Sequence, residues 1–141
     1  MKNLRFLSEG DARLMAEVSK RRTFKKGETI LKEGNVAPGL YILRTGAVRV
    51  EMDSRGDSVL VARLEPEEIM GIPSFLDGSP VSASLVADVA KTEVDFLNSV
   101  DLQAMLESKP GFAIRFYRSL ATILSARLNA AMERLVPPFS G

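Results

Sequence analysis

The spacing of apolar residues divides the 141-residue chain into a helical start, a stretch of strand-like spacing and a helical end. Residues 4–20 carry apolar side chains at helical spacing. Ser8 is followed three residues later by Asp11, which is the spacing of a capping box at a helix start. The basic triplet 20–22 would end the helix with positive charge, which is favourable at that end. We therefore predict an N-terminal helical segment over residues 1–22.

Residues 23–98 have an apolar period of two, which predicts short β-strands. Residues 40–52 alternate around the turn Thr45-Gly46 and predict a β-hairpin, and glycine occurs in most other turns. A short helical piece near 73–77, opened by Gly71, interrupts the strands. This pattern favours a roll over a parallel sheet. The predicted fold class is α+β, mainly β: a double-stranded β-helix (a jelly-roll-like β-roll) flanked by an N-terminal helix and a long C-terminal helix.

The helical period returns over residues 99–136, first in a short helix and then in a long one that Pro137-Pro138 would end. One apolar stripe of the long helix advances by three and four residues alternately, as a seam between two helices does. The seam consists of Ile114, Tyr117, Ala121, Leu124, Leu128, Ala131 and Leu135. A second stripe consists of Phe112, Phe116, Leu120 and Ile123. We expect the second stripe to cover the β-roll and the seam to form a homodimer; the alternative is one wide core face. The whole chain, 1–141, is expected to form a single domain.

Composition narrows the functions open to the chain. It contains no cysteine and no histidine, so it has no disulfide, no thiolate nucleophile and neither the commonest general base nor the commonest metal ligand. A net charge of +1 gives no electrostatic basis for binding nucleic acid. No apolar run approaches the length of a membrane span or of a signal peptide's core. We expect a cytoplasmic protein that is not an enzyme, holds no metal or cofactor, and contacts neither nucleic acid nor membrane directly.

The order of these elements, together with a series of short motifs, resembles the cyclic-nucleotide-binding domain of the catabolite-activator (CRP/FNR-like) family. The motifs are Phe24-Lys25-Lys26-Gly27-Glu28-Thr29-Ile30, Glu33-Gly34, Gly39-Leu40-Tyr41-Ile42-Leu43, Gly46-Ala47-Val48-Arg49-Val50, Leu64-Glu65-Pro66 and Phe75-Leu76-Asp77-Gly78-Ser79-Pro80. Each is weak alone, but their joint order is specific and runs from about Leu4 to Leu135. The resemblance implies a ligand pocket between the short helix and the following strand, closed by the long helix. Transcription factors of the family continue into a helix-turn-helix domain, which we expect this chain to lack.

The sequence departs from the family at both charged positions of that pocket. Met70-Gly71-Ile72 stands where the family has Phe-Gly-Glu, whose carboxylate accepts the ribose hydroxyl. Pro80-Val81-Ser82-Ala83 stands where the family has Pro-Arg-Ser/Thr-Ala, whose arginine pairs with the cyclic phosphate. An unpaired buried charge is strongly unfavourable, so cAMP and cGMP are disfavoured as ligands. We expect an apolar pocket instead. Its ligand-binding residues are predicted to be Gly71, Ile72, Val81, Ser82, Ala83 and Arg127.

Two functions are compatible with such a pocket. The domain is either a sensor in signal transduction, binding a small molecule and reporting through its C-terminal helix, or a ligand-free scaffold for dimerisation or protein docking. Arg127 on the long helix either offers a guanidinium that can bind an anion bidentately or is a solvated or interhelical side chain. An enzyme is disfavoured since no nucleophile–base pair accompanies Glu65, Glu67 and Glu68.

Overall fold

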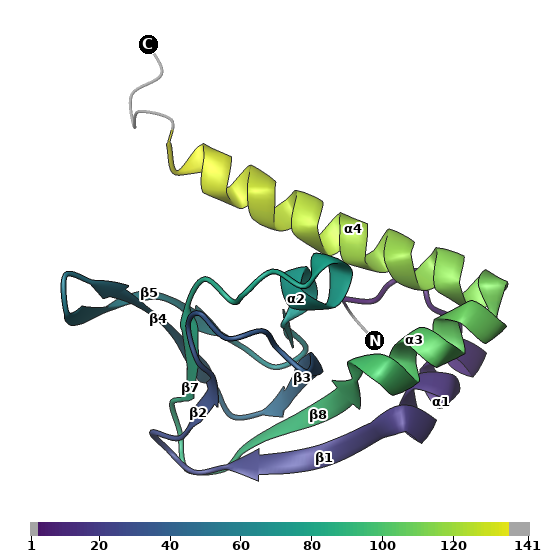
Figure 1. The fold of residues 1–141 in the computed structure, drawn as a ribbon, viewed down its shortest axis with the longest axis horizontal. Coiled ribbons are helices and arrows are strands. Elements are labelled where there is room, and N and C mark those ends of the chain that lie inside the picture. Colours follow the sequence, from purple (N-terminus) through teal and green to yellow (C-terminus); the bar gives the residue numbers. More distant parts are fainter. Residues whose placement is uncertain (1–2, 136–141) are drawn as a thin grey trace.

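The strands form two four-stranded antiparallel sheets, with helices packed outside one of them (Figure 1). The computed structural model describes residues 3–135. The sheet orders are β1-β8-β3-β6 and β2-β7-β4-β5. The strands are β1 Ser19–Phe24, β2 Thr29–Leu31, β3 Gly39–Thr45, β4 Val48–Ser54, β5 Asp57–Leu64, β6 Ile69–Met70, β7 Ser84–Ala87 and β8 Thr92–Asn98. The helices are α1 Glu9–Val18, α2 Ile72–Asp77, α3 Ser99–Ser108 and α4 Pro110–Glu133. This architecture confirms the predicted β-roll between an N-terminal and a long C-terminal helix.

Helix α1 starts as predicted but ends early. The Ser8 hydroxyl accepts a hydrogen bond from the Asp11 N–H, and the Asp11 carboxylate accepts one from the Ser8 N–H, which confirms the capping box. Residues 19–24, which include the basic triplet, form strand β1 instead of a helix end. Arg21 binds the Asp95 carboxylate of the neighbouring strand β8 at 2.7 Å, and such cross-strand pairs favour extended structure.

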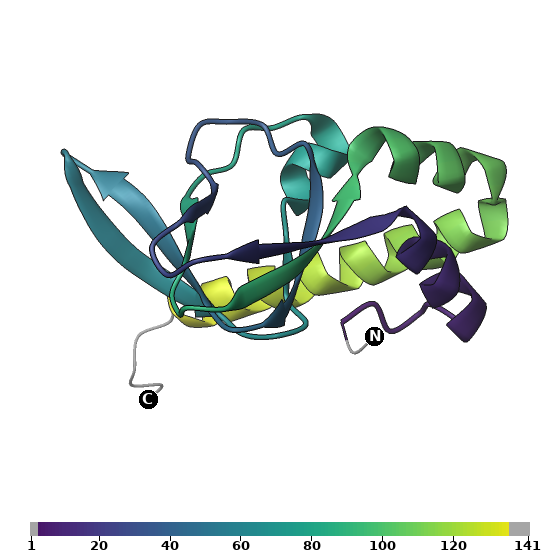
Figure 2. The same cartoon turned by 90° about the horizontal axis from the view of Figure 1, so that it is seen from below.

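The predicted β-hairpin over residues 40–52 is wrong. Strand β3 pairs with β6 and β8, whereas β4 pairs with β5 and β7, so the turn Thr45-Gly46 carries the chain from one sheet to the other. Gly46 has a φ of 90°, and a Cβ there would lie 2.7 Å from the hydroxyl of Thr92. The hairpin that forms joins β4 to β5 through Arg55-Gly56, both at positive φ as a type I′ turn requires. It projects from one end of the roll (Figure 2).

Two hydrophobic cores hold the layers together. Side chains alternate along β3, so Tyr41 and Leu43 face the core between the sheets, while Leu40 and Ile42 face the core beneath the helices. The core beneath the helices receives Leu4 from the N-terminal segment and, from the helices, Met15, Phe75, Leu102, Leu106, Phe112, Phe116 and Leu120. Within residues 3–135, no helix is both long enough and apolar enough to cross a bilayer.

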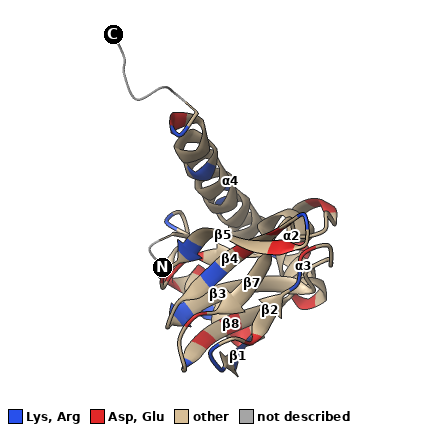
Figure 3. Ribbon diagram, turned by 90° about the vertical axis from the view of Figure 1, so that its left-hand side faces the viewer, with Lys and Arg blue, Asp and Glu red and all other residues tan. Residues whose placement is uncertain are grey.

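Helix α4 covers the roll with one stripe and exposes most of the other. Phe112, Phe116 and Leu120 are buried and Ile123 packs at their edge, so the second stripe covers the core as predicted. The seam is largely uncovered: Ile114 is 70% exposed and Leu128 is 60% exposed. Figure 3 shows the distal end of α4 projecting away from the strands, over which acidic and basic residues are interspersed.

The seam differs from the prediction at two of its members. Leu124 is half-buried and packs against the core of its own chain. Leu135 lies in a turn, because α4 ends at Glu133. The residues expected to end the helix, Pro137-Pro138, lie outside the described part of the chain.

Candidate functional site

A groove lies where the two sheets meet α2 and α4. We call it the β-roll groove, and its volume of about 280 Å³ is near the lower end of the range of small-molecule sites, roughly 300–1,000 Å³. It is lined by Val50, Leu64, Ile69, Met70, Gly71, Pro73, Val81, Ser82, Ala83, Leu85 and Arg127. The groove therefore draws on β4, β5, β6, β7, the segment around α2, and the long helix.

The structure brings five of the six predicted site residues together. Gly71, Val81, Ser82, Ala83 and Arg127 all line the groove. They come from three separate parts of the chain. The juxtaposition follows from the roll, which places the loop before β7 opposite β6 and beneath the long helix.

Ile72 does not line the groove, contrary to the prediction. Its side chain is fully buried in the core between the β1-β8-β3-β6 sheet and the helices. Ile72 is the first residue of α2, and successive helical side chains point about 100° apart, so Pro73 borders the groove while Ile72 faces the core. An isoleucine at this position strengthens the core rather than the wall of a pocket.

Gly71 is required by the fold itself. Its φ is 90°, and a Cβ at this position would lie 2.7 Å from the carbonyl oxygen of Gly39. The sequence interpretation assigned this glycine to the ligand site. The close contact with β3 accounts for it without a ligand.

The lining is apolar except at its rim. Ile69, Met70, Ala83 and Leu85 are buried at its base, and the half-buried Val50, Leu64 and Val81 form its walls. The sequence interpretation did not include Val50, Leu64 or Leu85. The alternation of side chains along a strand indicates which residues face inward, but it does not show which strands are neighbours. The pairing of β4 with β5 and β7 brings these three residues to the groove.

Arg127 is the one charged residue of the lining. Its Nη2 donates a hydrogen bond of 2.7 Å to the carbonyl oxygen of Ile69 on β6. Burial lowers the pKa of the guanidinium, and the negative charge of Glu68 opposes this. Among the described residues, no carboxylate lies within 4.0 Å of Arg127, so its charge has no ion-pair partner there.

Two polar residues that adjoin groove residues in the sequence make their contacts elsewhere. Arg63 forms an ion pair with Asp88 at 2.8 Å. The Ser84 hydroxyl accepts a hydrogen bond from the Glu33 N–H at 3.0 Å. Neither residue lines the β-roll groove.

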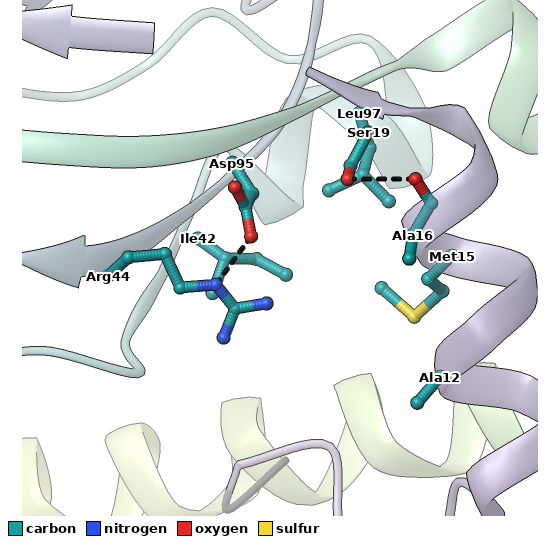
Figure 4. Close-up of a pocket in the computed structure, with 8 residues that line it drawn as sticks. All are labelled: Ala12, Met15, Ala16, Ser19, Ile42, Arg44, Asp95 and Leu97. Atoms are coloured by element: carbon teal, nitrogen blue, oxygen red, sulfur yellow. Dashed lines mark hydrogen bonds and ion pairs between the residues drawn. The ribbon is translucent and has the colours of Figure 1, made fainter. Parts of the chain in front are cut away.

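A second cavity, between α1 and the outer face of the β1-β8-β3-β6 sheet, is much smaller (Figure 4). Its volume is about 50 Å³. Arg44 and Asp95, which line it, already form an ion pair with each other, and its other walls include Met15 and Ile42. This space is large enough for water but too small for a metabolite.

Residues 21–109 match the family model described as the cyclic nucleotide-binding domain. The chain belongs to the cyclic nucleotide-binding domain family. A member of known structure, a cyclic nucleotide-binding domain from Methylobacillus flagellatus, is 26% identical and superposes with a TM-score of 0.85. The superposition covers 96% of this chain and 76% of that one. Family membership agrees with the resemblance found in the motifs.

Curated relatives are mostly longer proteins. The cyclic AMP receptor protein of Thermus thermophilus is 34% identical over 112 residues, which are 79% of this chain and 50% of the receptor. Glutaminase 1 of Bradyrhizobium diazoefficiens is 32% identical over 114 residues, which are 81% of this chain and 18% of the glutaminase. The chain thus spans half or less of the length of these relatives, so their activities as whole proteins do not follow from the match.

Proposed function

We propose that the chain is a cytoplasmic regulatory domain, not an enzyme, that binds a small molecule in the β-roll groove and reports binding through α4. The observation that carries this proposal is the position of Arg127. It belongs to α4, lines the groove and binds the Ile69 carbonyl of β6. A ligand in the groove therefore meets the helix and the sheet at one point. Since a ligand shifts an equilibrium only through contacts that differ between states, this shared residue provides a means of coupling.

The polar contacts of α4 indicate which part of the helix responds. Its first half is fastened to the N-terminal region: Arg115 forms a bidentate pair with Asp11, and the Ser119 hydroxyl accepts a hydrogen bond from the Phe6 N–H. The contact of Arg127 with Ile69 comes later, and the helix beyond it is exposed. We place the responsive segment at residues 123–133.

The lining argues for a ligand other than a cyclic nucleotide. Val81 lies in the groove wall, where the family resemblance implies an arginine for the cyclic phosphate. Ile72, at the position of the ribose-binding carboxylate, faces the core. Both ionic anchors are therefore missing from the groove, and their loss is expected to weaken cAMP and cGMP binding by orders of magnitude.

The domain is also proposed to form a homodimer through the exposed seam. The described part of the seam continues over the projecting end of α4, where no other residue among 3–135 covers it (Figure 1). Ala121 and Ala131 are small, so a second helix can approach closely. A second copy of the chain supplies the matching stripe.

This same exposed seam favours a second candidate function. A domain that has lost its nucleotide anchors can serve as a ligand-free scaffold for dimerisation or for docking another protein. The two candidates differ in whether the groove is ever occupied.

The test is thermal unfolding combined with amide hydrogen exchange, in the presence of cAMP, cGMP and a panel of small metabolites. A sensor is expected to show a Tm that rises with the concentration of one compound, together with slower exchange in residues 123–133. A flat response to the whole panel by a protein that is dimeric would overturn the sensor and support the scaffold.

A further inference from the structure

We infer that the ligand of the β-roll groove is an amphipathic monoanion: a short apolar body that carries one carboxylate. This inference rests on the proposed sensing function, because it names the ligand class of the same groove. Three features of the lining lead to it: the apolar base and walls, the single cation at the rim, and the scarcity of other polar groups.

The apolar body follows from the base and walls. The buried Ile69, Met70 and Leu85, with the half-buried Val50 and Leu64, offer hydrocarbon surface that water solvates poorly. Covering it with a hydrocarbon ligand is favourable in proportion to the apolar area removed from water. The lining contains no aspartate, glutamate or lysine, so nothing there favours a polar or cationic body.

The single negative charge follows from Arg127. Arg127 is exposed as a residue, and its Nη2 makes one hydrogen bond within the described residues, to the Ile69 carbonyl, which leaves other donors of the planar guanidinium for a ligand. Glu68 is the nearby carboxylate, but it accepts a hydrogen bond of 2.6 Å from the Glu65 N–H and forms no ion pair with Arg127. A ligand carboxylate can take the bidentate geometry that guanidinium favours.

The charge of Glu68 also limits the ligand to one negative charge. This residue and Arg127 line a neighbouring groove together with Asn3, Arg5 and Thr122. A second negative charge on the ligand would find no further cation in the β-roll groove and would be repelled by Glu68. A monocarboxylate satisfies Arg127 without that cost.

The scarcity of polar groups disfavours sugars and nucleobases. Ser82 supplies the one hydroxyl side chain in the lining. Ligand hydroxyl and amino groups placed against the remaining aliphatic walls would lose their hydrogen bonds to water without replacement, which costs about tenfold or more in affinity for each group. A hydrocarbon tail makes no hydrogen bonds to water, so it loses none when it enters the groove.

Calorimetric titration of the full chain with butanoate, hexanoate, octanoate and the neutral octanamide tests the inference. Affinity for the carboxylates is expected to rise about fourfold per added methylene until the groove is filled. Octanamide, which matches octanoate in body but lacks the charge, is expected to bind about 10- to 100-fold more weakly. Methyl NMR should place the octanoate shifts at Val50, Val81 and Leu85.

Two arginine variants, one on α4 and one at its C-cap, show whether Arg127 recognises the charge of the ligand. Arg127→Gln is expected to remove the preference for octanoate over octanamide, whereas the matched control Arg134→Gln, at the exposed end of the same helix, should keep it. Equal binding of octanoate and octanamide by the unchanged protein would overturn the monoanion inference but leave a sensing groove. Binding of cAMP in preference to every carboxylate would likewise overturn the monoanion inference and leave the sensing function in place. Failure of all probes, cAMP included, to bind would overturn both the inference and the proposed function.

Discussion

At the scale of single residues, the two aliphatic replacements in the family motifs have different consequences. Val81 is half-buried in the wall of an open groove, and a longer side chain there can reach solvent. Ile72 has no exposed surface and packs among the helices. The same kind of substitution therefore changes the lining of the β-roll groove at one position and the core at the other.

The environment of Ile72 predicts the effect of restoring the family's carboxylate. Ile72→Glu would bury a carboxylate without a cation or hydrogen-bond donors, so we expect a loss of about 3–5 kcal/mol in the free energy of unfolding. Ile72→Val, which only shortens the side chain, is expected to cost about 1 kcal/mol. Urea unfolding at pH 7 measures both. A stable Ile72→Glu variant would show that this side chain faces the groove after all.

A second prediction at this scale concerns Asp11. Two hydrogen bonds from Arg115, of 2.6 and 2.9 Å, are the main reason that its pKa is lowered from 3.8 to about 2. Because the folded pKa lies below the unfolded one, the carboxylate stabilises the fold above about pH 4, and this stabilisation is lost as the pH falls towards 2.

We therefore expect Asp11→Asn to lower the free energy of unfolding by about 2 kcal/mol at pH 7. The difference from the unchanged protein should shrink as the pH approaches 2. Glu9→Gln is the control, because its ion pair with Arg13 is exposed and 3.8 Å long, and it should change the stability by less than about 0.5 kcal/mol. Urea titrations from pH 7 to pH 2 measure the effect, and a difference that does not vary with pH would contradict the assignment.

At the scale of elements, α4 carries two apolar stripes, one buried and one largely exposed. The buried stripe ending near Ile123 holds the helix on the core, and the exposed seam is available to a second chain. Arg127 lies beyond the buried stripe and joins the distal helix to β6. The proposed dimer seam and the proposed ligand contact therefore lie on the same helical segment.

The exposed seam predicts the behaviour of two variants in sedimentation. Leu128→Glu places a charge on the seam and is expected to weaken dimerisation at least tenfold. Ala130→Glu adds the same charge two residues later, about 200° around the helix, and should leave the dimer intact. A monomer mass for the unchanged protein at every concentration would contradict the dimer itself.

At the scale of the whole molecule, periodicity predicted the layers but not the pairing of strands. The period of two identified most strands. It also predicted that β3 and β4 form a hairpin, although they lie in different sheets. The two-residue strand β6 was too short to show a period, and β1 carried the basic residues 20–22, which resemble a helix end. Pairing depends on contacts between distant residues, such as Arg21 with Asp95, which spacing along the chain does not reveal.

The candidate site was predictable to the extent that the family motifs align. Gly71, Val81, Ser82 and Ala83 were found through those motifs, and Arg127 through its place on the long helix. The motifs could not show that Ile72 points into the core, since that depends on the geometry of α2. They also could not show the hydrogen bond between Arg127 and Ile69, which joins residues 58 positions apart.

The most direct test of this account is a calorimetric titration of cAMP into the unchanged protein and into Val81→Arg under the same conditions. The account predicts no saturable binding at micromolar concentration by the unchanged protein. It predicts at least a tenfold gain in affinity for Val81→Arg, because the new guanidinium can pair with the cyclic phosphate. Micromolar binding of cAMP in the β-roll groove of the unchanged protein would contradict the central claim that this groove has lost its anchor for a nucleotide.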